Sequence, residues 1–346
     1  MSAETAKQFR TDGMAELDRL AIGEDAAKLG VLLAVLADVN IVLVGNPGGG
    51  KTTIGKQAHQ LVAGINPENV ADIPALADVT PKQIVGGISE TVKRIQDPET
   101  DKEIVQAINV ETKGIINPST QWIFANEINR AAPHAVTAFL EAIENRTVTN
   151  TAGTSVLEDL HVAVATMNPG EVNSKTFRLD HAIASRFPVG VILGSEVPLD
   201  ENGDPYLTDE QDTRVEDIFN GWIPAKEINT VTSLEDLENM RREANKVVIP
   251  DSLLREVGKP AVAYTLHEWA RADIPEADGR MAFQLGKTVR YLAMMHGEKE
   301  VTPFEFAEGI DYQVTARFGI LKPDASTEAP AAVERIQSKL GLETRR

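Results

Sequence analysis

The segment between residues 45 and 52 constrains the fold of this chain more than any other part of the sequence. It follows the apolar run 39–44 (Val-Asn-Ile-Val-Leu-Val) and precedes residues that are compatible with a helix. Its residues match the Gly-x-x-x-x-Gly-Lys-Ser/Thr pattern at every defined position, in the strand-loop-helix context that this pattern needs. The segment therefore predicts a buried strand, a glycine-rich loop and a helix, in that order.

Each residue type in this loop suits the binding of phosphate groups. Glycines allow backbone N–H groups to face the β- and γ-phosphates of a nucleotide, because no Cβ stands in the way. Lys51 supplies a cation to the phosphate oxygens, and the hydroxyl of Thr52 can ligate Mg²⁺. We expect the nucleotide to be bound by this loop and the residue after it, namely Gly45, Asn46, Pro47, Gly48, Gly49, Gly50, Lys51, Thr52 and Thr53.

Three further apolar runs have the form of buried strands. They cover residues 121–125, 161–166 and 188–193, and helical patterns lie between them, most clearly at 133–145. Strands that alternate with helices predict a parallel sheet with helices on both faces, which is an α/β fold.

The second half of the chain has a different character. Seven acidic residues and no basic one fall between Glu196 and Asp212, and this composition predicts a solvated loop or linker. Beyond it the pattern is helical only, and Thr302-Pro303 puts proline at a first helical position. Helices are expected at 234–247, 251–272, 280–296 and 303–317.

We therefore expect five regions along the chain. The first is expected to be helical over residues 13–38, with a break at Gly23, and the last ends in a short amphipathic helix. In order they are an N-terminal helical segment at 1–38, an α/β nucleotide-binding core at 39–195, an acidic linker at 196–225, an all-helical lid at 226–320 and a tail at 321–346.

Composition excludes several classes of function. Acidic residues outnumber basic ones 52 to 34, for a formal charge of −18, which argues against a broad nucleic-acid-binding face. Disulfides, thiol catalysis and thiolate metal sites are excluded because the chain has no cysteine. The sequence shows no signal peptide and no apolar run of membrane-spanning length, so we expect a cytoplasmic protein.

The apolar run 121–125 ends in Asn126-Glu127. An enzyme with this kind of phosphate loop needs an acid near Mg²⁺ and a base that polarises the attacking water. Glu127 is the candidate base. Asn126 occupies the metal-side position, where an amide can hydrogen-bond a metal-bound water but carries no negative charge.

Several segments together resemble the MoxR-type AAA+ ATPases, in the clade that carries an insert in helix 2. The resemblance extends from about residue 39 to residue 318, and its motifs fall in the expected order. Asn126 departs from the family pattern, which usually has Asp there. The segments that carry the resemblance are 80–87 (Thr-Pro-Lys-Gln-Ile-Val-Gly-Gly), 123–131 (Ile-Phe-Ala-Asn-Glu-Ile-Asn-Arg-Ala), 139–144 with 148–149, 165–169 (Ala-Thr-Met-Asn-Pro), 179–187, 279–281 and 301–303.

The resemblance implies roles for further residues. It implies that Asn168 senses the γ-phosphate or orients the lytic water, although Asn before Pro is also a common turn former. It implies that Arg186 is an arginine finger acting on a neighbouring subunit, with Arg178 as a competitor for this role. Arg280 would contact the nucleotide from the lid. The predicted site is then catalytic residues Lys51, Glu127, Asn168 and Arg186, with Thr52 and Asn126 as metal-side residues.

Asn129 and Arg130 follow Glu127 in the same motif. These two residues could act across a subunit interface, and a helix-capping role for the Asn is an equal alternative.

The resemblance also implies a function. We expect a core sheet of strand order 5-1-4-3-2, ATP and Mg²⁺ as cofactors, and a homo-oligomeric ring, expected to be a hexamer. The ring would hydrolyse ATP and act as a chaperone-like remodeller of partner proteins or metal-dependent clients. Its partner would be a separate polypeptide such as one with a von Willebrand factor A domain.

Three alternatives stay open on the sequence. Asn126 motivates a nucleotide-gated scaffold that hydrolyses ATP very slowly. A nucleic-acid motor related to the GTPase subunits of restriction enzymes is disfavoured by the charge of −18. A magnesium-chelatase motor subunit is a variant of the ring ATPase.

Overall fold

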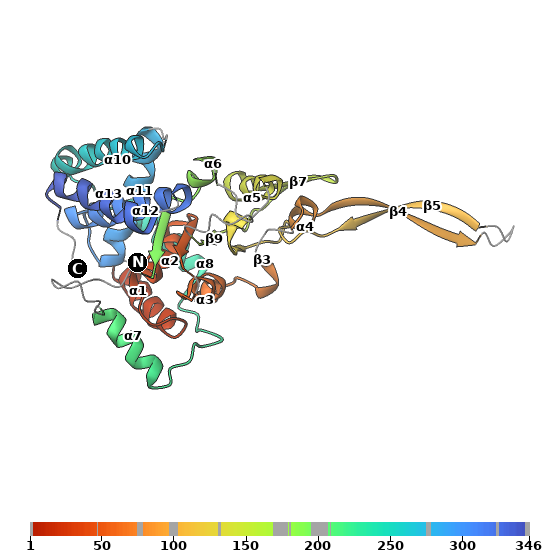
Figure 1. Cartoon of the computed structure of the whole chain (residues 1–346), viewed down its shortest axis with the longest axis horizontal. Coiled ribbons are helices and arrows are strands. Elements are labelled where there is room, and N and C mark those ends of the chain that lie inside the picture. The colour runs from red at the N-terminus through yellow and green to blue at the C-terminus, as the bar shows by residue number, and fades with distance from the viewer. Residues whose placement is uncertain are drawn as a thin grey trace.

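The computed structural model of the 346-residue chain has a parallel sheet at its centre, with helices on both faces (Figure 1). The structure describes residues 3–46, 48–74, 79–96, 103–130, 133–168, 179, 181–194, 207, 209–274, 278–322 and 325–342.

Five strands form the central sheet in the order β10-β1-β9-β6-β3, and all neighbouring strands are parallel. Counted along the chain, this is the order 5-1-4-3-2, so the predicted strand order and α/β fold are confirmed. The strands are β1 (Ile41–Gly45), β3 (Val70–Ile73), β6 (Trp122–Ala125), β9 (Val162–Met167) and β10 (Val189–Leu193).

The sequence analysis missed β3, the edge strand next to β6. Its four residues include Asp72, whose carboxylate pairs with the ammonium of Lys56 at 2.5 Å. A charged residue is compatible with an edge strand, but it interrupts the apolar run by which a buried strand is recognised.

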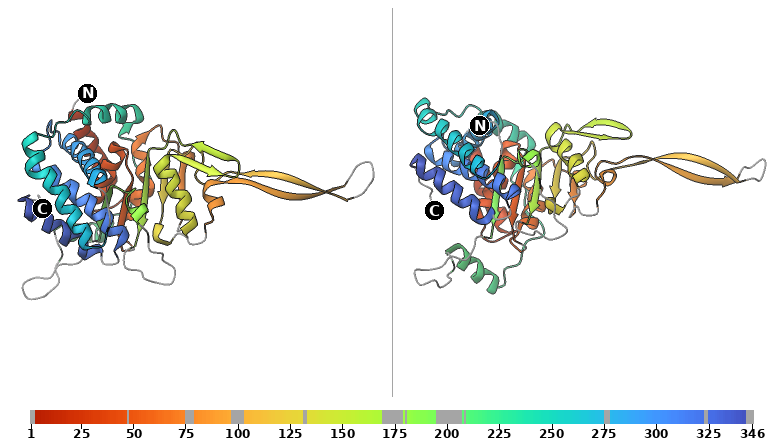
Figure 2. Two further views of the ribbon diagram at one scale, coloured as in Figure 1. Left: turned by 90° about the horizontal axis from the view of Figure 1, so that it is seen from above. Right: turned by 45° about the horizontal axis from the view of Figure 1, so that its top comes forward.

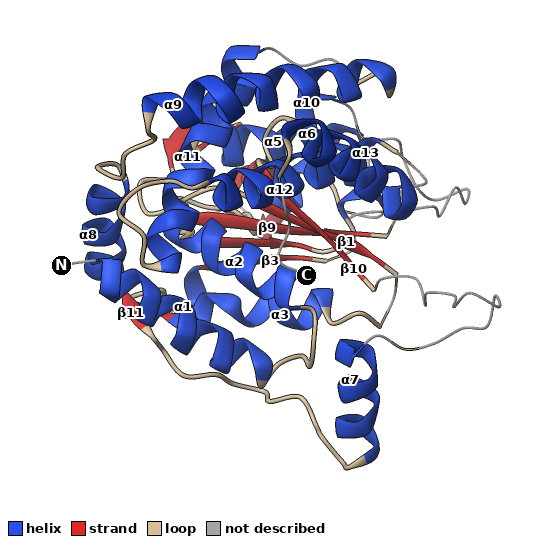
Figure 3. Ribbon diagram, turned by 90° about the vertical axis from the view of Figure 1, so that its left-hand side faces the viewer, coloured by secondary structure: helices blue, strands red, loops and turns tan. Residues whose placement is uncertain are grey.

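The two faces of the sheet build two hydrophobic cores. Side chains alternate between the faces along a strand. In β1, Ile41 and Leu43 join one core, whereas Val42 and Val44 join the other. Helix α2 (Asp25–Ala37) packs on the Ile41 face, and α5 (Pro133–Asn145) supplies Phe139 to the Val42 core. Figure 3 shows the sheet edge-on between these helices.

The N-terminal helices differ from the prediction in their limits. Helix α1 (Ala3–Asp18) begins ten residues earlier than expected and is followed by α2 (Asp25–Ala37). Gly23 lies between them with φ of 65°, so the predicted break is confirmed. Helix α3 (Lys51–Gln57) follows the glycine-rich loop, as predicted.

The C-terminal part of the described chain is helical, as predicted. Helix α12 begins with a capping box, in which Thr302 and Glu305 satisfy each other's backbone N–H groups and Pro303 stands at the first helical position. The helices are α8 (Leu234–Ala244), α9 (Asp251–Leu253), a π-helical turn (Leu254–Gly258), α10 (Lys259–Arg271), α11 (Asp278–His296), α12 (Pro303–Leu321) and α13 (Ala325–Leu340), preceded by the short strand β11 (Thr232–Ser233).

Part of the acidic linker is also helical. Residues 209–219 form helix α7 (Asp209–Phe219), so the expectation of a loop is wrong there. Val215, Ile218 and Phe219 stand at helical spacing within this helix, although Ile218 is 53% and Phe219 85% exposed. Residues 196–206 of the predicted linker lie outside the described part of the chain. Figure 3 shows α7 standing apart from the rest of the helices.

Two antiparallel hairpins that the sequence analysis did not identify extend from the body (Figures 1 and 2). The longer pairs β4 (Gly87–Gln96) with β5 (Glu103–Thr112), and the shorter pairs β7 (Thr147–Asn150) with β8 (Gly153–Val156). The turn of the shorter hairpin touches the base of the longer one, because the N–H of Ile88 donates to the Thr151 hydroxyl at 2.6 Å. The longer hairpin begins at Gly87, the last residue of the segment 80–87 that carries part of the family resemblance.

Helix α12 packs directly on β10. A Cβ added to Gly190 would lie 2.3 Å from the Cα of Ala316 and 2.6 Å from its backbone nitrogen. Glycine is therefore required at this crossing, since backbone atoms cannot give way as a side chain can. This packing joins the C-terminal helices to the sheet. Among the described helices, none is long and apolar enough to cross a membrane.

We predict that Gly190→Ala lowers the free energy of unfolding by about 2–3 kcal/mol, because the added methyl group overpacks the contact between β10 and α12. Gly286→Ala is the control. It lies inside α11, where an added Cβ meets only the end of Arg290 at 3.6 Å, and it should stabilise the chain by about 0.5–1 kcal/mol. Chemical denaturation measures both, and equal effects would contradict the close packing.

Candidate functional site

The glycine-rich loop forms a tight turn between β1 and α3. Gly48 and Gly50 have φ values of 93° and 81°, a region that residues with a Cβ rarely adopt. Gly45 is needed for a different reason, since a Cβ there would lie 2.4 Å from the carbonyl oxygen of Leu193 on β10. Pro47 lies outside the described residues.

Lys51 is buried inside this turn, with 6% of its surface exposed. Its ammonium donates to the carbonyl oxygens of Gly45 and Asn46, both at 2.6 Å. Burial lowers the pKa of Lys51, and the carboxylates of Glu127 and Glu24 act in the opposite direction. A cation held in this way is well suited to bind an anion that enters the turn.

Asn126 lies at the end of β6 and faces the loop. Its Oδ1 accepts hydrogen bonds from the Thr166 hydroxyl at 2.8 Å and the Thr52 hydroxyl at 3.4 Å. Thr52 thus directs its proton toward Asn126, which leaves a lone pair of its oxygen free for a metal ion. Asn126 retains the acceptor function that a carboxylate would have at this position, but without its charge.

Glu127 has a left-handed backbone conformation, with φ of 50°. Its N–H donates to the Thr166 hydroxyl at 2.9 Å, and its carboxylate accepts a hydrogen bond from Asn168 Nδ2 at 2.8 Å. Arg130 lies 3.1 Å from the second carboxylate oxygen. Asn129 in turn donates to the backbone oxygen of Asn168 at 3.0 Å. The carboxylate is thereby fixed at the edge of the cavity, in a position suited to accept a proton from water.

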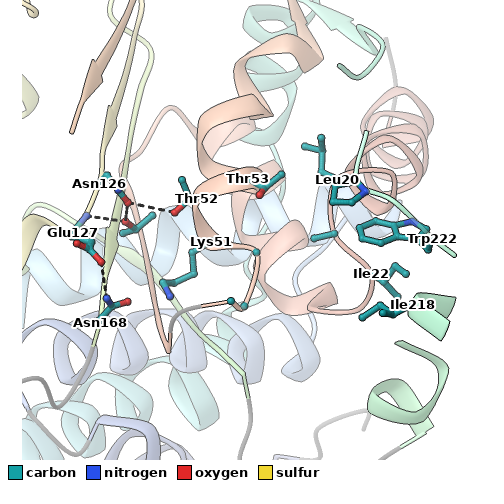
Figure 4. A pocket seen from close by; sticks show the side chains of 16 residues that line it. Leu20, Ile22, Lys51, Thr52, Thr53, Asn126, Glu127, Asn168, Ile218 and Trp222 are labelled. Atoms are coloured by element: carbon teal, nitrogen blue, oxygen red, sulfur yellow. Dashed lines mark hydrogen bonds between the residues drawn. The ribbon is translucent and has the colours of Figure 1, made fainter. Parts of the chain in front are cut away.

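These residues line one cavity of about 420 Å³, in which Lys51, Thr52, Asn126, Glu127 and Asn168 converge (Figure 4). The predicted phosphate-binding and catalytic residues of β1, β6 and β9 are thus brought together. Thr53 and Gly48 to Gly50 also line this cavity.

The donors near Asn126 fit Mg²⁺. In the described part of the chain, no group of three or more His, Asp or Glu residues could hold a metal ion by itself. Mg²⁺ usually keeps several waters and binds through one or two protein oxygens plus substrate phosphates, so a large cluster is not required. The oxygens of Thr52 and Asn126 are hard donors that could hold such an ion and supply charge neutralisation.

Sequence reasoning missed the far end of the cavity. Beyond Thr53 the walls are apolar and come from the turn before α2, from the end of α7 and from the segment after it (Figure 4). The only sequence signal was the apolar spacing of Ile218 and Trp222, four residues apart, next to an acidic segment. These walls are formed by Leu20, Ala21, Ile22, Ile218, Trp222 and Pro224.

Arg186 and Arg280 do not line this cavity. They line a second one of about 270 Å³, together with Glu144, Phe283 and Lys287. Arg280 therefore lies away from the phosphate loop of its own chain, and its contact with the nucleotide stays a prediction.

Contacts beside Arg186 and Arg280 account for their position. Arg186 Nε donates to Glu144 Oε2 at 2.9 Å, and Gln284 of α11 donates to the carbonyl oxygen of Ser185 at 3.3 Å. Because α12 packs on β10, α11 lies beside the segment before β10 instead of over the loop. Arg178, the competitor for the finger role, lies outside the described residues.

Comparisons with known proteins agree with this geometry. Residues 40–189 match the ATPase family associated with various cellular activities (AAA). The chain is 24% identical over 333 residues to the uncharacterised protein YeaC of Bacillus subtilis, covering 95% of this chain and 93% of that protein. It is 25% identical over 186 residues to the chaperone MoxR1 of Mycobacterium tuberculosis, covering 54% of this chain and 44% of that one.

A similar fold occurs in the crystal structure of a candidate ATPase from Cytophaga hutchinsonii. The TM-score is 0.65 at 22% identity, and the match covers 97% of this chain and 96% of the other. The likeness extends over the helical C-terminal part as well as the sheet.

We predict that Lys51→Met weakens nucleotide binding by roughly 10- to 100-fold, the range expected for a lost hydrogen bond to a charged group. The free chain should be at least as stable as before, because a buried ammonium that carries a desolvation cost is replaced by an apolar side chain. Calorimetric titration with ADP and thermal unfolding measure the two effects. Unchanged affinity would exclude Lys51 from the phosphate site.

Proposed function

Because this chain is a MoxR-type AAA+ ATPase, we propose that it works as a homo-oligomeric ring, in which each subunit completes the ATP-hydrolysis site of its neighbour. One observation carries this proposal. The base, Glu127, lies beside the phosphate loop, whereas Arg186 and Arg280 lie together in another cavity. Two arginines that do not reach their own loop are suited to reach that of a second copy.

The chemistry within one subunit follows from the fixed contacts of Glu127. Its carboxylate accepts the proton of the attacking water, and Asn168 holds it in place through the 2.8 Å hydrogen bond. Lys51 neutralises charge on the transferred phosphoryl group, and backbone N–H groups of the loop hold the remaining oxygens. Mg²⁺ held at Thr52 and Asn126 would supply further positive charge.

The neighbouring subunit supplies the rest. Arg186 is paired with Glu144, and its side chain is 19% exposed. In an assembled ring it would stabilise charge that develops on the phosphoryl oxygens, a contribution of about 10³–10⁵ in rate for arginine fingers of related chemistry. Arg280, which shares the cavity, would contact the same nucleotide. Closed rings are the usual result of such head-to-tail contacts, and we propose a hexamer.

The apolar end of the cavity supports a preference for ATP over GTP. No charged or amide side chain is among the six residues that form these walls. A guanine edge has more polar groups than an adenine edge. Each of these polar groups would lose its bound water against the apolar walls and gain no side-chain partner, so guanine is expected to bind more weakly. Stacking on Trp222 serves either purine.

We propose that the ring remodels proteins in the cytoplasm. A curated relative is named a chaperone, and the long β4–β5 hairpin extends far from the body of the subunit, where it could meet a client (Figure 2). The partner is proposed to be a separate protein, such as one with a von Willebrand factor A domain. The uncharged Asn126 supports a second candidate, a scaffold that assembles with ATP and hydrolyses it slowly.

We predict that Glu127→Gln and Arg186→Ala each lower kcat by at least about 10²-fold at concentrations that assemble the ring. Mixed one to one, the two inactive variants should regain turnover, because roughly a quarter of their interfaces pair an intact Glu127 with an intact Arg186. ATP turnover over a range of mixing ratios measures this recovery.

Arg255→Ala is the control for the mixing experiment, since this exposed arginine lines neither cavity. It should keep wild-type turnover. A mixture that stays inactive would contradict the trans-acting role. A different result would favour the scaffold. In that case the wild type hydrolyses ATP slowly, the variants have the same low kcat, and only Asn126→Asp raises it.

We predict that Trp222→Ala weakens ADP binding by roughly 5- to 100-fold, the range for a lost base–aromatic stack. Phe219→Ala is the matched control, because Phe219 is close in sequence, is 85% exposed and does not line the cavity. Its affinity should equal that of the wild type. Titration with a fluorescent ADP analogue tests both, and equal affinities for the two variants would remove Trp222 from the base site.

A further inference from the structure

One hydroxyl group contacts both residues at the end of β6. Thr166 lies on β9, the strand that pairs with β6 and β1, and is 1% exposed. Its Oγ1 donates to Asn126 Oδ1 at 2.8 Å and accepts from the N–H of Glu127 at 2.9 Å. The hydroxyl therefore donates its single proton to Asn126 and accepts the backbone N–H of Glu127 with a lone pair.

We propose that Thr166 is a positioning residue for ATP hydrolysis, which orients Asn126 and Glu127 together. This inference rests on the proposed roles of those two residues. Thr166 itself need not touch the nucleotide or the water, because its effect passes through the two side chains that do.

The amide at position 126 makes this orientation necessary. A carboxylate presents acceptor oxygens on both sides, whereas an amide presents one oxygen and one NH₂ group. The hydroxyl protons of Thr166 and Thr52 both point at Oδ1. Reversing the amide would set a donor against these donors, so Thr166 holds the oxygen toward Thr52, where a metal-side acceptor is useful.

The backbone of Glu127 gives the second reason. A non-glycine residue with φ of 50° is in a sparsely populated conformation, which persists only when neighbouring contacts hold it. The hydrogen bond from its N–H to Thr166 is such a contact. It sets the direction in which the Glu127 side chain leaves the strand, and hence where its carboxylate meets Asn168.

Thr166→Val tests the proposal, because it keeps the shape of the side chain and removes the hydroxyl. We expect kcat to fall roughly tenfold or more, as for the loss of one or two buried hydrogen bonds, while KM for ATP changes less than about threefold. Thr166→Ser should keep kcat within about threefold of wild type. Thr166→Ala gives the same comparison if the valine variant does not fold.

Thr265→Val is the matched control. Thr265 is fully buried in α10, and its hydroxyl has no hydrogen-bond partner in the described part of the chain. It should leave kcat unchanged, so a loss seen only at position 166 reflects the hydroxyl and not a general effect of the substitution.

Making Thr166→Val in a chain that already carries Asn126→Asp separates a positioning role of the hydroxyl from a merely structural one. In Asn126→Asp the carboxylate needs no orienting, so Thr166→Val should cost clearly less there than in the wild-type chain. An equal cost in both backgrounds would overturn the link through Asn126.

Two outcomes distinguish this inference from the function on which it rests. If Glu127→Gln is inactive but Thr166→Val keeps wild-type kcat, only the role of Thr166 is overturned. If Glu127→Gln keeps wild-type kcat, the assignment of the base fails, and the role of Thr166 fails with it.

Discussion

The pairing of β9 with both β1 and β6 is the interaction on which the proposed hydrolysis site depends. The three strands run in parallel, so their carboxyl ends meet at one edge of the sheet. The glycine-rich loop, the Asn126-Glu127 pair and Asn168 each follow directly after one of these ends. Loops at the carboxyl ends of parallel strands are the usual ligand sites of open α/β sheets. A different strand order would separate the same residues.

The second constraint is the balance of charge inside the cavity. Lys51 is buried and its pKa is lowered by desolvation, while Glu127 is held by Asn168 and lies near Arg130. The amide of Asn126 adds no further negative charge next to the hydroxyl of Thr52. The chain as a whole carries a formal charge of −18, so Lys51 in the loop and the cations Arg186, Arg280 and Lys287 of the second cavity contrast with its average composition.

The packing of α12 on β10 decides where the C-terminal helices lie relative to the phosphate loop. Gly190 admits the backbone of α12 to the sheet, and α11 is then anchored beside Ser185 and Arg186. Arg280 at the start of α11 therefore shares a cavity with Arg186 and not with Lys51. This arrangement brings together two arginines that are distant in sequence, and it separates both from the loop of their own subunit.

Much of the fold and the centre of the site could be predicted from the sequence, because local patterns carry that information. Buried parallel strands appear as short apolar runs, a phosphate loop needs glycines and a lysine at fixed spacing, and a capping box with proline marks the start of α12. The sequence by itself therefore determined the α/β class, four of the five strands and the loop with its following helix. Only the tertiary structure decided the edge strand with Asp72, the apolar walls at Leu20 and Trp222, the contacts of Thr166 and the cavity that holds Arg280. Each of these depends on which segments pack together across long stretches of chain, and a contact between distant segments leaves no periodic pattern in either of them.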